Sequence, residues 1–255
     1  MAIWLQGLII VGGTVLLALA GLGTVRRRVD AATLQIHHDV AGFIIAVVGV
    51  VFGVLLAVVV SAVWEDYSHA HVVVDTEANE LADLFRLAQA VPDPAGRRLR
   101  ELARAYAAVV VDEEWEAMGR GAASPAAMAA IDSLWHEVLA LEVPEASASP
   151  RAGHLLAAMG DLADARRMRL VESRAHVPTV LWFALVGGAI CTIGFTFLFG
   201  VRQARTQVVM TALLAVTISL NLFVVAVLDQ PLGGEMGVGP EAFELDRAIF
   251  DASPP

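Results

Sequence analysis

Histidine and carboxylate side chains that could bind a metal or carry protons gather at two places in the sequence. His37, His38 and Asp39 directly precede a long apolar run, and Glu65 and His69 follow it. Histidine titrates near neutral pH, so each group could respond to pH. Adjacent residues on a helix diverge by about 100°, which places His37 and His38 poorly for holding one ion together. We interpret these five residues as candidate pH sensors and expect no metal site.

The apolar run keeps the two groups apart. A helix rises about 1.5 Å per residue, so the stretch from His38 to Glu65 spans roughly 40 Å. The two groups therefore cannot form one site within a chain. Asp39 stands directly before Val40, where its carboxylate could cap the helix that follows. The alternative for the histidines is a hydrogen-bonded position at a membrane surface without a sensing role.

The composition indicates a membrane protein. The chain has 255 residues, 57% of them hydrophobic, and a mean hydropathy of +0.67. A helix that crosses a bilayer needs about 20 apolar residues. Four segments without any charged residue meet this requirement: 2–23, 40–63, 178–200 and 208–228. We therefore expect an all-α integral membrane protein with four transmembrane helices.

A polar region with helical periodicity separates the second and third of these segments. We expect transmembrane helices one and two in 1–63, a soluble helical-bundle domain in 64–177, transmembrane helices three and four in 178–228, and an acidic C-terminal tail in 229–255. The second span is predicted to continue as one helix to about residue 90. The helix before Pro178 is predicted to run into the third span, with a kink or boundary at this proline.

Two further local patterns bear on the soluble part and the tail. Ser124 followed by Pro125 is typical of a capped helix start, because proline fits the first helical position. In the tail, Phe243, Ile249 and Phe250 are spaced so that they could lie at the lipid interface.

Arginines in the short loops predict the orientation. All 17 basic residues of the chain are arginine. They include Arg26, Arg27 and Arg28 after the first span, and Arg202 and Arg205 between the third and fourth. Short cytoplasmic loops are enriched in such residues. We expect both loops in the cytoplasm and the protein in the cell (inner) membrane, with the soluble domain and both termini outside or in the periplasm.

Charge and motifs exclude several classes of function. The net charge of −10 argues against nucleic-acid binding. The sequence has no nucleophile beside a base, no phosphate-binding glycine loop and no zinc-ligand spacing. We therefore expect no enzyme, no cofactor and no nucleic-acid partner, and we expect membrane lipid and small ions as the molecules in contact with the chain.

The second span carries a stripe of small residues at intervals of three or four: Gly42, Ala46, Gly49, Gly53 and Ala57. Small residues let helix backbones approach closely. The stripe predicts a helix partner, either within the chain or in a homo-oligomer. The alternative is a glycine-lined pore.

The fourth span carries Thr217 and Asn221 on one face. A polar residue in mid-span usually points inward. We expect an interhelical hydrogen bond there, and the alternative is a contact along an ion pathway.

Six blocks of sequence, in order along nearly the whole chain, resemble a bacterial family of unknown function that is described as bestrophin-like: HHDVAGF at 37–43, WEDY at 64–67, EEW at 113–115, LFG at 198–200, MTALL at 210–214 and LDQPLGG at 228–234. Bestrophins are pentameric anion channels whose second span lines the pore and continues into a soluble helical domain. The resemblance adds Phe43 and Phe52 as the phenylalanines available for a pore neck. The candidate pore or packing residues are Gly42, Phe43, Ala46, Gly49, Phe52, Gly53, Ala57 and Asn221.

Two functions of different classes remain open. The first is an oligomeric membrane protein with channel-like, ion-conducting function and undetermined ion selectivity. The acidic soluble region would concentrate cations rather than anions if copies formed a ring. The second is a membrane-anchored sensor or scaffold whose helical domain binds a ligand or partner. Oligomeric state separates the two.

Overall fold

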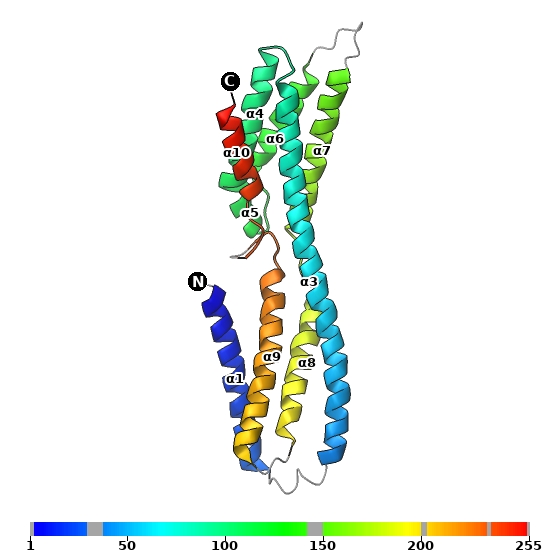
Figure 1. Cartoon of the computed structure of the whole chain (residues 1–255), viewed down its shortest axis with the longest axis vertical. Helices are drawn as coiled ribbons and strands as arrows, with labels where there is room; N and C mark the ends of the chain where they lie inside the picture. The colour runs from blue at the N-terminus through cyan, green and yellow to red at the C-terminus, as the bar shows by residue number, and fades with distance from the viewer. Residues whose placement is uncertain (1–2, 30–37, 142–149, 200–202, 234–235, 254–255) are drawn as a thin grey trace. The chain divides into compact units, whose positions relative to one another are not determined.

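A computed structural model describes residues 3–29, 38–141, 150–199, 203–233 and 236–253 (Figure 1). The described residues form helices and contain no strand, which confirms the all-α prediction for them. Four of the described helices are long and apolar enough to cross a membrane. They are α1 (Ile3–Arg28), α3 (His38–Ala88), α8 (Thr179–Phe197) and α9 (Ala204–Leu228).

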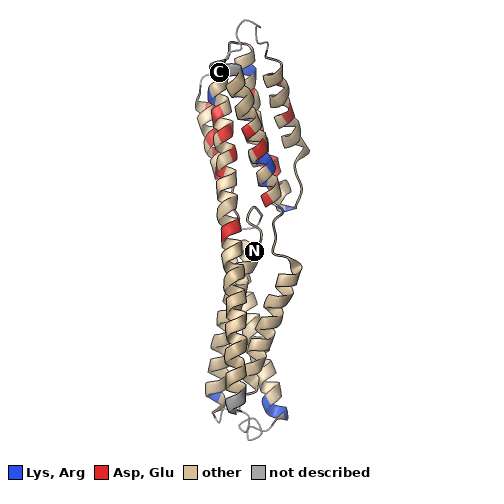
Figure 2. Ribbon diagram, turned by 90° about the vertical axis from the view of Figure 1, so that its right-hand side faces the viewer, with Lys and Arg blue, Asp and Glu red and all other residues tan. Residues whose placement is uncertain are grey.

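Contacts divide the chain into two units, which we describe separately. The first unit comprises Met1–Glu65 and His176–Asp229, and the second comprises Asp66–Ala175 and Gln230–Pro255. The two units differ in charge, because Asp and Glu lie on the helices of the second unit and are rare in the first (Figure 2).

Helix α3 is a single helix of 51 residues, as the sequence predicts. No glycine or proline interrupts it after Gly53, and bonds from Gln89 to Arg86 and from Ala90 to Leu87 tighten its end. Pro92 follows, and proline cannot donate the next helical hydrogen bond. At its start, α3 begins at His38, one residue before the predicted cap.

The first unit is held together by close helix contacts. Its two apolar clusters contain Ala18, Phe52, Ala189, Ile193, Ala215 and Ile218, and Val59, Val63, Leu185 and Val225. A Cβ atom at Gly21 of α1 would lie 2.8 Å from Cε2 of Phe197, and one at Gly7 would lie 3.0 Å from Cε1 of Phe223. Glycine is therefore needed where α1 approaches these rings, because small residues permit close packing of apolar helices.

Polar bonds close the ends of the apolar helices in this unit. Gln207 is 3% exposed, and its Nε2 donates to the carbonyl oxygens of Thr196 at 3.0 Å and Phe199 at 2.9 Å. Arg26 Nη1 donates to Gln207 Oε1 at 2.8 Å. One buried side chain thus satisfies carbonyls at the end of α8 and joins α9 to the last turn of α1.

The second unit is a helical bundle around the C-terminal part of α3. Its other elements are α4 (Ala95–Val109), a π-helical turn (Val110–Glu114), α5 (Trp115–Gly119), α6 (Pro125–Leu139), α7 (Pro150–Glu172) and α10 (Glu241–Ala252). Ser124 Oγ accepts a hydrogen bond from Ala127 N at 3.3 Å, which confirms the predicted cap of α6.

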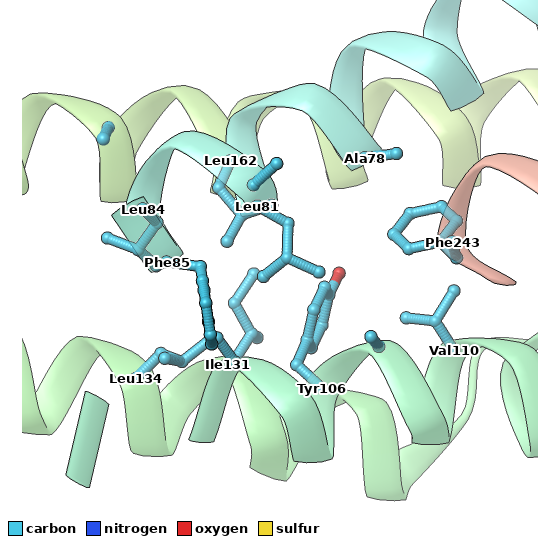
Figure 3. Close-up of a cluster of buried hydrophobic side chains, with 14 of the residues drawn as sticks. Ala78, Leu81, Leu84, Phe85, Tyr106, Val110, Ile131, Leu134, Leu162 and Phe243 are labelled. Atoms are coloured by element: carbon cyan, nitrogen blue, oxygen red, sulfur yellow. The ribbon is translucent and has the colours of Figure 1, made fainter. Parts of the chain in front are cut away.

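The apolar core of this unit gathers residues from α3, α4, α6, α7 and α10 (Figure 3). Leu81 and Phe85 of α3 point toward Tyr106 of α4 and Ile131 of α6, and Leu162 of α7 lies beside them. All five are at most 5% exposed. The apolar faces of these helices thus pack together in one core.

Of the two alternatives predicted at Pro178, a kink or a boundary, the structure shows a boundary. The helix before this proline, α7, ends at Glu172 and does not run into the third span, and α8 begins at Thr179. Proline lacks the N–H that a continuous helix needs and disfavours helical geometry in the residue before it.

The tail is also different from its prediction. Phe243 and Phe250 lie on α10 and are 0% and 1% exposed in the core of the second unit, so they do not meet a lipid interface. Ile249 is 47% exposed on another face of the same helix. An amphipathic helix suits a protein core as well as a membrane surface, and the spacing alone does not separate the two.

Candidate functional site

The small-residue stripe of α3 has open space beside it. A Cβ atom added at Gly42, Gly49 or Gly53 would meet nothing within 4 Å. Ala46 and Ala57 of the stripe are exposed. The described residues therefore leave the stripe open at its glycines, and the first unit does not supply the packing partner that the sequence predicts.

The two phenylalanines of α3 lie in different surroundings. Phe43 is 74% exposed, whereas Phe52 is 6% exposed and packs against Gly188 of α8. A separation of nine residues turns a helix by about half a revolution beyond whole turns, so the two rings take opposite faces. In the described unit Phe52 is a core residue, and the two phenylalanines do not come together.

A groove of about 510 Å³ runs beside the stripe in the first unit. Its lining residues are Gly53, Leu56, Ala57, Val60, Ser61 and Trp64 of α3 and Asn221 of α9. Three of the predicted site residues, Gly53, Ala57 and Asn221, therefore come together on one surface. The groove is mostly apolar, with Ser61 and Asn221 as its uncharged polar groups.

Polar side chains of α9 form hydrogen bonds within their own helix and with α8. Asn221 Nδ2 donates to the carbonyl of Thr217 at 2.8 Å, and Thr217 Oγ1 donates to the carbonyl of Leu213 at 3.0 Å. Both bonds stay within the helix, unlike the predicted interhelical contact. The bond between helices is made instead by Thr211 and Thr196, whose hydroxyl oxygens lie 3.1 Å apart.

The candidate pH sensors fall into described and undescribed groups. His37 and the side chains of His38 and Asp39 lie outside the described residues. Glu65 is exposed. The sequence places His69 one turn from Glu65, but the structure pairs His69 with α7 instead: Nδ1 lies 3.1 Å from Oε1 of Glu172. Their side chains are 50% and 21% exposed, so this is a partly solvated contact of α3 with α7.

The centre of the second unit contains four buried charged side chains that the sequence analysis did not identify. Arg169 of α7 donates from Nε to Glu77 Oε2 at 2.6 Å and from Nη2 to Glu77 Oε1 at 3.0 Å. The same Nη2 reaches Glu114 Oε2 at 2.7 Å, and Arg166 Nη2 reaches Glu114 Oε1 at 2.5 Å. These four side chains, which we name the ion cluster, are 0–5% exposed and have a formal charge of zero.

Aromatic rings and the sulfur atom of Met118, which lies 2.9 Å from Arg169 Nη1, surround the ion cluster. Tyr106 donates its hydroxyl to Glu77 Oε1 at 2.6 Å, and burial raises the pKa of this hydroxyl well above its usual value. The Arg169 guanidinium lies 5.3 Å from the Trp115 ring and 5.7 Å from the Phe243 ring. Its pKa is raised, because the attraction of the neighbouring carboxylates outweighs the opposing effect of burial. The Arg169 guanidinium therefore stays charged.

The π-helical turn positions one member of the ion cluster. Trp115 N donates to the carbonyl of Val110, five residues back, and Glu114 is the last residue of this turn. Turns of this kind are rare and appear mostly as single turns within α-helices. The EEW block of the sequence thus contains a buried carboxylate, Glu114, beside the exposed Glu113.

A signal for the ion cluster does exist in the sequence. Leu155, Met159 and Leu162 mark the buried face of α7, and Arg166 and Arg169 continue their spacing of three or four. Arginine and glutamate are almost never fully buried unless they are paired, so charged residues that continue an apolar stripe are candidates for a buried ion pair. Among the described residues, no three His, Cys, Asp or Glu side chains are arranged to hold a metal ion.

Comparisons with known proteins agree with this architecture. A family model described as a Bestrophin-like domain matches residues 12–243. A bacterial bestrophin homologue from Klebsiella pneumoniae is similar in structure, with a TM-score of 0.72, 13% identity and coverage of 97% of this chain and 99% of that chain. A variant of a Klebsiella pneumoniae bestrophin homologue is similar as well, with a TM-score of 0.74, 12% identity and coverage of 99% of both chains.

A further solved structure, a variant described as a membrane protein, has a TM-score of 0.70 and 12% identity over 97% of this chain and 99% of that chain. No curated protein matches the sequence. Identities this low establish the fold alone, whereas the family model covers most of the chain. The protein therefore belongs to the bestrophin-like family.

Proposed function

We propose that this chain is one subunit of an oligomeric membrane channel and that α3 lines or flanks its ion pathway. The observation that carries the proposal is the open stripe on α3, where Gly49 and Gly53 have no neighbour to fill the space beside them. Such a surface in a membrane provides close helix contact. A second copy of the chain supplies the missing helix, and membership of the bestrophin-like family favours a channel.

The proposal needs a ring of copies. The outward face of α3 in the first unit is apolar, with Val50, Val54 and Val58 each at least 60% exposed. Four helices in one chain leave little room for a water-filled path. Identical surfaces repeated around an axis can close into a ring, and a pathway then forms on the axis.

We assign the first unit to the membrane and the second unit to water. The first unit, with its four apolar helices, lies in the membrane, and the soluble region 64–177 with α10 lies in water. The arginines at the end of α1 and at Arg205 favour the cytoplasm for that end. The acidic second unit would raise the local concentration of cations around the entrance. Reversal potentials under asymmetric salt determine which ion passes.

The first test is the oligomeric state of the full chain in detergent and in lipid nanodiscs, measured by light scattering. Wild type should be a closed oligomer. Gly49→Leu and Gly53→Leu should shift it toward monomer, because each adds a large side chain to the proposed contact. Gly13→Leu is the matched control, since this glycine lies on α1 and is also open within the chain.

The second test is ion flux through the protein reconstituted in liposomes between pH 5 and pH 8. We expect flux that is lost in the two α3 variants and kept in Gly13→Leu. A folded monomer without flux at any pH would reject the channel and leave the membrane-anchored sensor as the function of this chain.

A further inference from the structure

Aromatic rings and one arginine hold α10 in the second unit. Phe250 stacks on Phe85 of α3 with ring centroids 4.1 Å apart, and Phe243 is fully buried. Arg104 of α4 donates from Nε and Nη2 to the carbonyl of Phe250 at 3.0 and 2.7 Å, and from Nη2 to that of Ser253 at 3.2 Å. These bonds satisfy carbonyls at the C-terminal end of α10, where a positive charge is also favoured by the helix dipole.

A carboxylate lies on the same buried face of α10. Asp246 comes three residues after Phe243 and four before Phe250, and it is 7% exposed. Its Oδ2 is buried and has no hydrogen-bond partner among the described residues. Burying an ionised carboxylate without a partner is unfavourable, so the neutral acid is the form that suits this position.

The charged groups around α10 are engaged elsewhere. From α3, Arg86 donates to a carboxylate on its own helix at 2.8 Å, and its effect on Asp246 is smaller than that of burial. From α4, Arg104 binds the carbonyls at the end of α10. From the π-helical turn, Asp112 pairs with Arg247 at 3.0 Å, and both of these side chains are substantially exposed. None of these groups forms a hydrogen bond with Asp246 in the described residues.

We propose that α10 is a pH-responsive clasp on the second unit, docked while Asp246 is protonated and loosened when this carboxylate ionises. The carboxyl group sits between the two phenylalanines that anchor the helix. Any water that enters to solvate the ionised form must therefore pass into the contact that holds α10 in place. The proposal concerns the second unit alone and stands whether or not the protein conducts ions.

The direction of the effect follows from linkage. Burial raises the pKa of docked Asp246 to about 6, from an ordinary value of 3.8. The docked state therefore binds more protons than the undocked state between these values, and docking weakens as the pH rises through 6. At pH 5 most docked molecules carry the proton, whereas at pH 8 almost none do. The docking equilibrium should fall about tenfold between these two pH values.

The experiment is hydrogen–deuterium exchange of the full chain in detergent, with the protection of the α10 amides compared at pH 5 and pH 8 after correction for intrinsic exchange. Wild type should lose protection about tenfold at pH 8. Asp246→Asn has no ionisable group at this position and should keep the same protection at both pH values. Asp251→Asn is the matched control, since Asp251 is exposed on the same helix, and it should behave as wild type.

Phe250→Ala provides the undocked reference, because it removes the stack on Phe85 and should expose α10 at both pH values. Equal protection of wild-type α10 at pH 5 and pH 8 would overturn the proposal. A tenfold loss that persists in Asp246→Asn would overturn it as well, because another group would then be responsible.

Discussion

The two units of the chain use charge in opposite ways. In the first unit, the apolar stretches of α1, α3, α8 and α9 contain no Asp, Glu, Lys or Arg, and the contact of Thr196 with Thr211 is between neutral groups. In the second unit, four charged side chains lie at the centre, and Arg169 is fully buried between Glu77 and Glu114.

The difference shows two ways to specify helix packing. The first unit relies on shape, because glycines such as Gly21 and Gly188 receive the rings of Phe197 and Phe52. An apolar side chain gains as much from contact with lipid as from contact with another apolar helix. Only close packing therefore favours the contact between helices over the contact with lipid. The second unit has a core of apolar side chains, which many arrangements could bury about equally well. A buried set of ion pairs penalises every arrangement that leaves one charge without its partner.

The largest effect should come from breaking the ion cluster. Arg169→Leu leaves Glu77 and Glu114 buried without their shared cation, and we expect it to lower the free energy of unfolding of the second unit by about 3–5 kcal/mol. Chemical unfolding followed by circular dichroism measures this loss. Arg167→Leu removes an exposed arginine two residues away that pairs with Asp164, and it should change stability by less than about 1 kcal/mol. Similar losses in both variants would contradict a special role for the buried charges.

A smaller effect is expected from overfilling the first unit. Gly188→Leu places a side chain where the Phe52 ring lies, and overpacking of this kind costs about 1–3 kcal/mol. Thermal unfolding in detergent measures it. Gly187→Leu is the control, because that neighbour has nothing within 4 Å. Adding Phe52→Ala to Gly188→Leu should recover part of the loss. If the double variant is as unstable as the sum of the two changes, the ring is not the obstacle.

The buried cap of α6 at Ser124 should matter less than the ion cluster, because it is a single hydrogen bond between neutral groups. Ser124→Ala removes the oxygen that accepts from Ala127 N, and loss of such a cap costs about 1 kcal/mol. Ser133→Ala serves as the control, since this exposed hydroxyl bonds only to a carbonyl within α6. Urea unfolding compares the two. Equal stability of Ser124→Ala and wild type would show that solvent replaces the cap fully.

The smallest effect should come from the contact between α3 and α7. His69→Ala removes the pairing with Glu172, and partly exposed pairs contribute about 0–1 kcal/mol. A double-mutant cycle with Glu172→Gln isolates the interaction. A coupling energy comparable to that of the ion cluster would mean that this contact, and not the centre, fixes how α7 lies on α3.

Much of the fold can be predicted from the sequence, because hydropathy and the residues that begin and end a helix are local signals. The four apolar segments, the unbroken α3 and the capped start at Ser124 all follow from residues close together in the chain. The end of the helix before Pro178 could not be placed, since the break between Glu172 and Thr179 depends on one proline that sequence alone allows either to kink or to end a helix.

The candidate site is predicted less well because it depends on which faces meet. The sequence identifies the small residues of α3, but only the structure separates the open Gly53 from the ring contact of Phe52. The burial of Phe243 was missed because an amphipathic helix fits lipid and protein alike. The ion cluster was missed because charges count as surface by default, although Arg166 and Arg169 continue the apolar spacing of α7.

The π-helical turn has the effect of one residue inserted into a helix. Its bond from Trp115 to Val110 encloses one residue more than an α-helical bond would. Deletion of the exposed Glu113 would remove this extra residue and let a regular helix run through the region, so the residues of the turn itself would change orientation. Glu114 would turn away from the arginines of α7. The length of this segment, and not only its composition, therefore determines where the carboxylate lies, so insertions and deletions here should be tolerated less well than substitutions.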